Sequence, residues 1–343
     1  MILSIIVPMY NAKDFIGVCL DSLLNQNLSI TDYEVLVVND GSTDGSQTIV
    51  ETYAKKYSNI VLCNQSNSGN GAARNKGIAL AKGKYLYFLD ADDYLADYVL
   101  EGLIKILENN NLDILGFNSV NTTSSQLNTP HNINIFEDVG NYKLTKGINF
   151  LADHNYRAEV WWYIVKTEYF KGTGISFYNR KFVQDSYITP SIFINAQRVM
   201  FIPLDAHRYR QNDNSITHIK SPKHIKKHMD DLIFSVNKLA HLIETVNNEK
   251  CILRLKNRQQ GYVFFFLIRF AKSNMTFKAL KDVINHLKLI SAYPITHFIG
   301  EDYNGFKYRF LVFIFNKPLL LYPFLYMLRA VYRQKNRKQL QFD

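Results

Sequence analysis

The first 117 residues alternate between short apolar runs and stretches whose apolar residues recur at helical spacing. The apolar runs cover 2–7, 33–38, 60–63, 85–89 and 113–117. Continuous apolar runs of this length are typical of strands buried on both faces, and the stretches between them have helical periodicity. Strands and helices that alternate in this way predict an α/β fold, with a mostly parallel, Rossmann-like sheet flanked by helices.

Each strong polar cluster in this part follows the carboxyl end of a predicted strand. The clusters are Pro8-Met9-Tyr10-Asn11, Asn39-Asp40-Gly41-Ser42 and Asp90-Ala91-Asp92-Asp93. Ligands of open α/β sheets bind beyond the carboxyl ends of the strands, so we expect the clusters to converge on one nucleotide site. There Asp40 could accept a uracil N–H and Tyr10 could stack on a base. Taken alone, the second cluster is also typical of a tight turn.

Three carboxylates follow the strand that ends at residue 89. Clustered carboxylates repel one another unless a cation lies among them, and Mg²⁺ or Mn²⁺ bridging to a substrate diphosphate is the usual arrangement. The sequence therefore predicts a metal site at Asp90-Ala91-Asp92, with Asp93 at the start of the next helix. The alternative is that these acids serve only as a helix cap.

A glycine-rich segment, 67–75, lies between the second and third clusters. Gly69 and Gly71 would let the backbone approach a ligand closely. Arg74 follows in the first turn of a predicted helix, where a cation is unfavourable with the helix dipole, so we expect it to have an anionic partner: a diphosphate or a site carboxylate. The segment has neither the Walker A pattern nor Gly-x-Gly-x-x-Gly spacing, which disfavours hydride transfer on a dinucleotide.

Together these segments resemble the family 2 glycosyltransferases of the bacterial surface-polysaccharide type, which are inverting enzymes with the GT-A fold. The resemblance rests on residues 5–11, 37–46, 69–75 and 89–93. It implies that Asp92 is the main ligand of Mn²⁺ or Mg²⁺ and that Asp90 faces the ribose or the waters of the metal. The donor-binding residues that it implies are Pro8, Tyr10, Asn11, Asp40, Arg74, Asp90 and Ala91.

The resemblance is weaker beyond residue 120. The stretch 160–166 looks like the family's Trp-containing strand beneath the acceptor site, and 209–217 resembles its segment that folds over the donor. Asp185 falls where the family carries its general base, although Gln184 replaces the usual preceding Glu. The alternative for Asp185 is a turn acid or a helix cap. The residues implied for the acceptor site or the covering loop are Trp162, Gln184 and Arg210.

The resemblance implies a metal-dependent transfer of a hexosyl or N-acetylhexosaminyl group from a nucleotide sugar, most often a UDP-sugar. The acceptor would be a hydroxyl of a glycan or a lipid-linked molecule. One alternative is a nucleotidyltransferase, which shares the sheet and the metal but usually carries a glycine-rich basic loop after its first strand. A second alternative is a non-catalytic protein that binds a sugar nucleotide or acts as a membrane scaffold, which the Gln at 184 suggests.

Charge is divided unevenly along the chain. Residues 1–219 carry 18 Lys and Arg against 22 Asp and Glu, whereas residues 220–343 carry 22 against 8. This difference predicts a boundary near Ser221-Pro222, and so a catalytic domain over 1–220 and a helical region over 221–343. A long loop is expected over 118–140.

The C-terminal region combines aromatic residues with Lys and Arg, most densely over 310–338. This composition favours helices that lie at an anionic membrane surface. The alternative is a helical subdomain whose aromatic residues form its own core. Nucleic acid is not an expected partner, because no recognised nucleic-acid-binding motif accompanies the basic residues.

The three cysteines have no metal-ligand spacing, and the sequence begins directly on a predicted strand. Both features favour a reduced setting without a secretory leader. The expected location is therefore the cytoplasmic face of a membrane.

Overall fold

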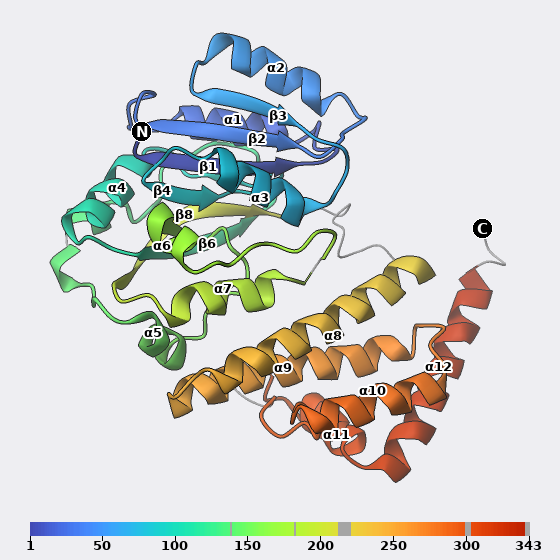
Figure 1. Cartoon of the computed structure of the whole chain (residues 1–343). Helices are drawn as coiled ribbons and strands as arrows, with labels where there is room; N and C mark the ends of the chain where they lie inside the picture. Colours follow the sequence, from blue (N-terminus) through green and yellow to red (C-terminus); the bar gives the residue numbers. More distant parts are fainter. Residues whose placement is uncertain (138, 182, 212–220, 299–302, 340–343) are drawn as a thin grey trace. The chain divides into compact units, whose positions relative to one another are not determined.

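The computed structural model describes residues 1–137, 139–181, 183–211, 221–298 and 303–339. The chain divides into two compact units, Met1–Asp213 and Asn214–Asp343. The first unit contains the sheet, and the second contains helices (Figure 1). The division lies a little before the predicted boundary at Ser221-Pro222.

The first unit alternates strands and helices along most of its length. Its strands are β1 (Leu3–Met9), β2 (Tyr33–Asn39), β3 (Ile60–Asn64), β4 (Tyr85–Phe88), β5 (Tyr94–Leu95), β6 (Ile114–Thr122), β7 (Tyr163–Lys166) and β8 (Val199–Arg210). Its helices are α1 (Ile16–Leu24), α2 (Ser46–Lys56), α3 (Asn70–Leu80), α4 (Leu100–Asn109), α5 (Gly147–Asp153), α6 (Thr167–Gly172) and α7 (Asp185–Ile194), with short 3₁₀ turns at Ile133–Glu137 and Val139–Asn141.

The strands form one sheet in the order β3-β2-β1-β4-β7-β6-β8-β5. Four neighbouring strands are parallel: β3, β2, β1 and β4. Strand β7 pairs antiparallel with β4, and β5 pairs antiparallel with β8. The predicted α/β class is confirmed, and the five predicted strands are β1, β2, β3, β4 and β6. Because β1, β2 and β4 run in the same direction, their carboxyl ends meet at one edge.

Helices cover both faces of the sheet (Figure 1). On one face the odd-numbered residues of β1, such as Ile5 and Val7, join a core with the apolar sides of α1, α2 and α4. On the other face α3 packs so closely that a Cβ on Gly77 would lie 2.4 Å from Cγ2 of Ile6. Only glycine allows this approach, which fixes α3, and therefore Arg74, against the strand ends.

Three local expectations are wrong. Asp93 does not begin a helix, because β5 follows it and α4 starts at Leu100. The expected loop 118–140 begins as strand, since β6 continues to Thr122 along β8. The expected strand 160–166 forms only over β7, and both tryptophans lie in the turn before it. In each case pairing with a distant strand decides the conformation.

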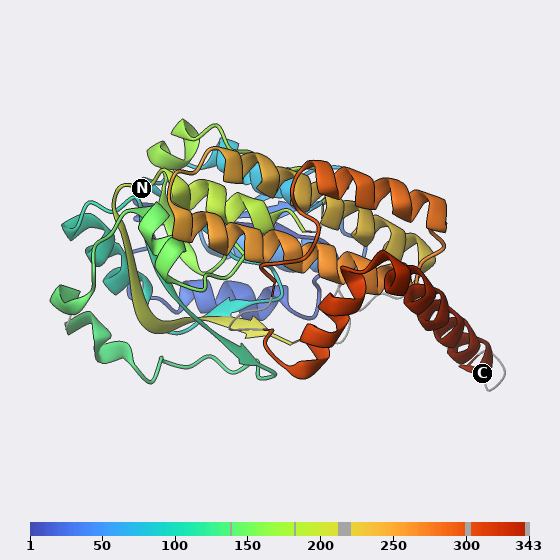
Figure 2. The same cartoon turned by 90° about the horizontal axis from the view of Figure 1, so that it is seen from below.

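The second unit contains α8 (Pro222–Glu244), α9 (Glu249–Phe270), α10 (Phe277–Leu289), α11 (Phe306–Phe315) and α12 (Pro318–Gln339). Its core is aromatic, with the Phe264 ring 4.4 Å from Phe298 and 5.4 Å from Phe315, centroid to centroid. Figures 1 and 2 show α12 leaving α11 at a sharp bend. Among the described residues no single helix is long and apolar enough to cross a membrane, whereas α11 and α12 pass that test together as a pair bent by 113°.

Candidate functional site

The loops after β1 and β2 are tied together at the edge where the parallel strands end. The backbone N–H of Asn11 donates to Ser42 Oγ (3.0 Å), and the N–H of Thr43 donates to Asn11 Oδ1 (2.9 Å). Asn11 has a φ of 48°, a left-handed conformation that Asn tolerates better than most residues. The neighbouring Tyr10 is left 52% exposed, so its ring is available to a ligand.

Asp40 is buried and already accepts several protein hydrogen bonds. Its Oδ1 accepts from Gln65 Nε2 (2.8 Å) and the N–H of Ser68 (2.7 Å), and its Oδ2 accepts from the N–H of Gly69 (2.8 Å). A carboxylate has about four acceptor positions, so Asp40 retains room for one further donor. Its main structural effect is to fix the loop before α3.

The glycine-rich loop makes its close approach to the chain itself. A Cβ on Gly71 would lie 2.2 Å from the carbonyl oxygen of Tyr178, and Gly69, at a φ of 90°, faces the backbone of Arg180. Gln184 fixes the same segment, because its Oε1 accepts from the N–H of Tyr178 (2.6 Å) and its Nε2 donates to the carbonyl of Lys181 (3.1 Å). The segment before α7 is therefore held against the start of α3.

Arg74 joins two carboxylates that are distant in sequence. Its Nη2 lies 2.8 Å from Asp90 Oδ1, and its Nη1 lies 3.0 Å from Asp185 Oδ1. The Arg74 side chain is 2% exposed and lies over the ring of Phe177. Burial alone would lower the pKa of Arg74, but Asp185 and Asp90 outweigh it and raise this pKa. The anionic partner expected for Arg74 is therefore a pair of site carboxylates.

Asp185 is the first residue of α7, and its side chain is 22% exposed. Burial raises its pKa to about 6, against the lowering effect of Arg74, while Asp90 and Glu159 raise it further. A pKa near 6 leaves this carboxyl mostly ionised at pH 7.5 and still basic enough to accept a proton. The group is thus suited to general-base catalysis near neutral pH.

The acids after β4 crowd one another. Burial, followed by the charges of Asp93 and Asp90, raises the pKa of Asp92 to about 7. Burial and Asp90 also raise the pKa of Asp93 well above its usual range, although Asp93 Oδ1 accepts from the N–H of Arg210 (2.9 Å). Such a set of carboxylates is short of positive charge, which fits a divalent cation.

The described residues do not include a group of three His, Cys, Asp or Glu side chains arranged as a complete metal site. Mg²⁺ is often held by only one or two carboxylates together with substrate phosphates. Asp90 and Asp92 fit that kind of partial site.

Two residues that were not predicted from the sequence, His207 and Trp161, pack together, with His207 next to Asp93. His207 is fully buried, with Nδ1 2.8 Å from Ser119 Oγ and Nε2 3.3 Å from Asp93 Oδ2. Its ring stacks on Trp161 with centroids 4.2 Å apart. Burial lowers the pKa of His207 to about 3, so the ring is neutral and packs beside Asp93 without offsetting its charge.

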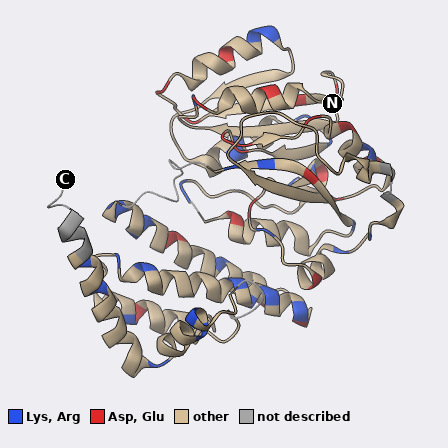
Figure 3. Cartoon of the chain, turned by 180° about the vertical axis from the view of Figure 1, so that it is seen from behind, with Lys and Arg blue, Asp and Glu red and all other residues tan. Residues whose placement is uncertain are grey.

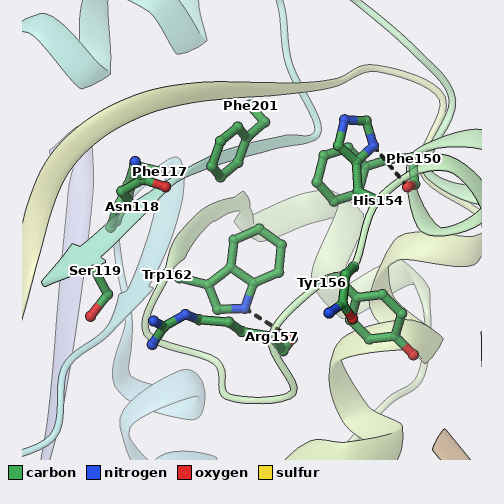
Figure 4. Close-up of a pocket in the computed structure, with 10 residues that line it drawn as sticks. Phe117, Asn118, Ser119, Phe150, His154, Tyr156, Arg157, Trp162 and Phe201 are labelled. Carbon is green, nitrogen blue, oxygen red and sulfur yellow. Dashed lines mark hydrogen bonds between the residues drawn. The ribbon is translucent and has the colours of Figure 1, made fainter. Parts of the chain in front are cut away.

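A pocket of about 270 Å³ lies beside Trp162 (Figure 4). It is lined by Phe117, Asn118, Ser119, Phe150, His154, Asn155, Tyr156, Arg157, Trp162 and Phe201. Trp162 is itself 3% exposed, and its Nε1 donates to the carbonyl of Arg157 (3.2 Å). None of the described residues that line this pocket is Asp or Glu. Ser119 of the lining is hydrogen-bonded with His207, which lies beside Asp93.

The predicted site residues thus fall into three places. Asp90, Asp92, Arg74 and Asp185 come together, and the donor-side residues of β1 and β2 occupy the same sheet edge. Ala91 is buried between the acids, and Pro8 is buried within β1, opposite Val38 of β2. Trp162 lines the pocket, and Gln184 directly precedes Asp185 and holds the segment before α7.

Arg210 ends β8, and its guanidinium lies over the ring of Phe15 at 4.8 Å. Its backbone N–H holds Asp93, so the end of β8 is anchored to the acids after β4. The rest of the segment expected to cover the donor, 212–217, lies outside the described residues.

A sheet of this topology, with acids and an Arg gathered at its parallel strand ends, is typical of enzymes that use nucleotide-activated substrates. The family profile described as "Glycosyl transferase family 2" matches residues 4–170. The chain belongs to this family.

Curated relatives agree with this assignment. The chain is 35% identical over 230 residues to the uncharacterized glycosyltransferase EpsJ of Bacillus subtilis, a match that covers 66% of each protein. It is 45% identical over 116 residues to the poly(ribitol-phosphate) beta-glucosyltransferase of Bacillus spizizenii, a match that covers 33% of this chain and 18% of that protein. The aligned part therefore spans no more than about two thirds of either relative.

The fold also matches solved structures. Residues 1–349 of S. aureus TarS, solved in complex with UDP, superpose with a TM-score of 0.64 at 21% identity, covering 98% of this chain and 92% of that one. The same part of TarS was also solved with UDP-GlcNAc, at a TM-score of 0.62, 21% identity and the same coverage. The expected GT-A fold with a helical C-terminal region is confirmed.

Proposed function

We propose that this chain transfers a sugar from a nucleotide-diphosphate donor to a hydroxyl of an acceptor, with inversion at the anomeric carbon. The observation that carries the proposal is the contact of Arg74 with both Asp90 and Asp185. The buried Arg74 holds Asp90, on the donor side, near Asp185, whose pKa suits a general base. A transfer reaction needs these two functions side by side.

The proposed donor is a UDP-sugar bound at the ends of β1, β2 and β4. The exposed Tyr10 ring would stack on the base, and the remaining acceptor position of Asp40 would take the uracil N–H. Asn11 and Ala91 would line the donor site with their backbone. The complexes of TarS with UDP and UDP-GlcNAc support this choice of nucleotide.

Asp92 and Asp90 would hold Mn²⁺ or Mg²⁺ against the donor diphosphate. Bound there, the ion would offset the negative charge that develops on the departing diphosphate. The raised pKa of Asp92 supports this proposal, because added positive charge would relieve the repulsion that raises it.

In the proposed reaction Asp185 takes the proton of the acceptor hydroxyl. The acceptor oxygen forms a bond to the anomeric carbon from the face opposite the donor diphosphate. The bond from that carbon to the diphosphate oxygen breaks, and its electron pair leaves with UDP. Arg74 keeps Asp185 ionised before the step and stays beside the growing negative charge of the leaving group.

We propose a glycan or a lipid-linked molecule of the cell surface as the acceptor. The similarity to a poly(ribitol-phosphate) beta-glucosyltransferase, which covers 33% of this chain, supports this class. The pocket beside Trp162 offers aromatic faces and Arg157, a lining suited to a sugar of the acceptor. Gln184 would act on the acceptor only by holding the segment before α7.

The experiment is a screen of UDP-hexoses and UDP-N-acetylhexosamines by thermal shift, with and without Mn²⁺, followed by an assay for released UDP. We expect one donor to stabilise the protein in a metal-dependent way and to release UDP when an acceptor is added. Release of pyrophosphate when the protein is given UTP and a sugar 1-phosphate would instead indicate a nucleotidyltransferase. Donor binding without any turnover across glycan and lipid-linked acceptors would favour the non-catalytic alternative.

A further inference from the structure

Helix α11 presents three phenylalanines to solvent along one side. Phe306, Phe310 and Phe313 are spaced four and three residues apart, so they lie on one helix face. They are 84%, 49% and 55% exposed. Phe315, on the opposite side of the helix, is buried, and so is Ile314 beside the phenylalanine row. Helix α11 therefore carries apolar side chains on its exposed face as well as on the face that packs into the unit.

Helix α12 continues the pattern after the bend. Leu321, Leu325 and Arg329 recur every four residues and face the interior of the unit. The opposite side carries apolar side chains that are 43% to 90% exposed. We define the outer stripe as Phe306, Phe310, Phe313, Leu319, Leu320, Tyr326, Met327 and Val331.

The outer stripe is not needed for the core of its own unit. The aromatic core is made by residues such as Phe264, Phe270 and Phe298, which are at most 2% exposed. The alternative expectation of an aromatic core thus accounts for α9 and the segment that packs on it, but not for the outer stripe. Contiguous exposed apolar side chains of this number mark an interaction surface.

Basic side chains border the outer stripe. Lys307 and Arg309 lie on the two sides of the phenylalanine row of α11. Lys317, in the bend before α12, and Arg333, on α12, are exposed. Residues 306–339 contain no Asp or Glu. Lys and Arg predominate over acids along the helices of this unit (Figure 3). A surface complementary to the outer stripe and its cations would have an apolar layer beneath negatively charged groups.

We propose that α11 and α12 dock on an anionic lipid surface, with the outer stripe inserted at the boundary of headgroups and acyl chains. An apolar face edged by Lys and Arg is the arrangement that lies in the plane of such an interface. The four exposed cations named above would contact the anionic headgroups. This docking is independent of the proposed transfer, because it needs neither donor nor base.

The test is flotation of the full chain with vesicles of phosphatidylcholine alone or with added phosphatidylglycerol. We expect binding to the anionic vesicles and little to the neutral ones. The double variant Phe310→Ser/Leu319→Ser should lower binding about tenfold or more with an unchanged melting temperature, since both side chains are exposed. The matched control is Leu289→Ser, because Leu289 is 84% exposed but lies on α10 outside the outer stripe, and it should bind like the wild type.

A second pair of variants tests the charges. Each of Lys307→Gln and Arg309→Gln should weaken anionic binding about fivefold, which corresponds to about 1 kcal/mol for each cation at the surface. Lys281→Gln, at an exposed position on α10, should have less effect.

Three results would overturn the proposal. One is anionic binding that the double variant leaves unchanged. Another is self-association of the chain that the double variant abolishes in the absence of any vesicle binding, which would assign the outer stripe to a second copy. The third is resistance of bound protein to alkaline carbonate extraction, which would indicate that the bent pair spans the bilayer. UDP release measured on the same samples separates this question from the proposed transfer.

Discussion

Replacing Arg74 by Met would remove the cation between Asp90 and Asp185 while keeping most of its volume. Arg74 is 2% exposed, and its two carboxylate partners are 29% and 22% exposed, so solvent screens the pairs only in part. Breaking a buried pair on one side typically costs about 3–5 kcal/mol, because the remaining charges are left without a partner. We expect Arg74→Met to lower the free energy of unfolding by about 3 kcal/mol at pH 7.5.

The same substitution should change the pH dependence of the reaction. Arg74 lowers the pKa of Asp185, against burial and the charge of Asp90, so its loss raises that pKa above about 6. The acidic limb of the kcat/KM profile should therefore move to higher pH. The stability loss should be smaller at pH 5, where the unpaired carboxyls can take up protons.

The assay is urea unfolding followed by tryptophan fluorescence, since both tryptophans, Trp161 and Trp162, lie in the first unit and report on it alone. The matched control is Lys84→Met, which breaks an exposed pair with Glu108 and should cost about 1 kcal/mol or less. An Arg74→Met protein that unfolds like the wild type and keeps its acidic limb would refute the reasoning. If this variant does not fold, Arg74→Lys, which can keep one of the two pairs, should show the same shift of the limb to a lesser extent.

Three further predictions follow from the site. Gly71→Ala should cost about 2 kcal/mol or more, because its Cβ would lie 2.2 Å from the carbonyl oxygen of Tyr178, whereas Gly172→Ala, in open space, should be neutral within about 0.5 kcal/mol. The pKa of Asp92 is raised from 3.8 to about 7, so the unfolded chain binds fewer protons in that window, and the melting temperature in chelator should fall between about pH 4 and pH 7. Asp92→Asn should flatten that fall, and Mn²⁺ should stabilise the wild type more at pH 7.5 than at pH 5. His207→Ala should cost about 2–4 kcal/mol in urea unfolding, since it empties a fully buried position; a cost under about 0.5 kcal/mol would contradict its supporting role.

The parallel strands and the gathering of their polar ends could be predicted from the sequence. Apolar runs fix the strands, and the rule for parallel sheets places their carboxyl ends together. The same reasoning gave Arg74 an anionic partner, because its helix position is unfavourable without one. That Asp185 is this partner could not be read from pattern alone, since 111 residues separate the two.

Other parts of the site depend on contacts that leave no local signal. His207 lies on a strand whose alternating pattern does not distinguish a supporting His from an ordinary buried one. In sequence Asp93 looks like a helix cap. In the structure it accepts the backbone N–H of Arg210, 117 residues away, and so anchors the end of β8. Gly71 looks like a ligand-binding glycine, yet its missing side chain makes room for the segment at Tyr178.

The central claim is that Asp185 is the base of a sugar transfer at this site. The most direct measurement compares UDP release in the presence of acceptor for the wild type and Asp185→Asn, with UDP binding measured in parallel. We expect turnover to fall by about a hundredfold or more while UDP binding stays within about threefold of the wild type. Unchanged turnover in Asp185→Asn would contradict this claim.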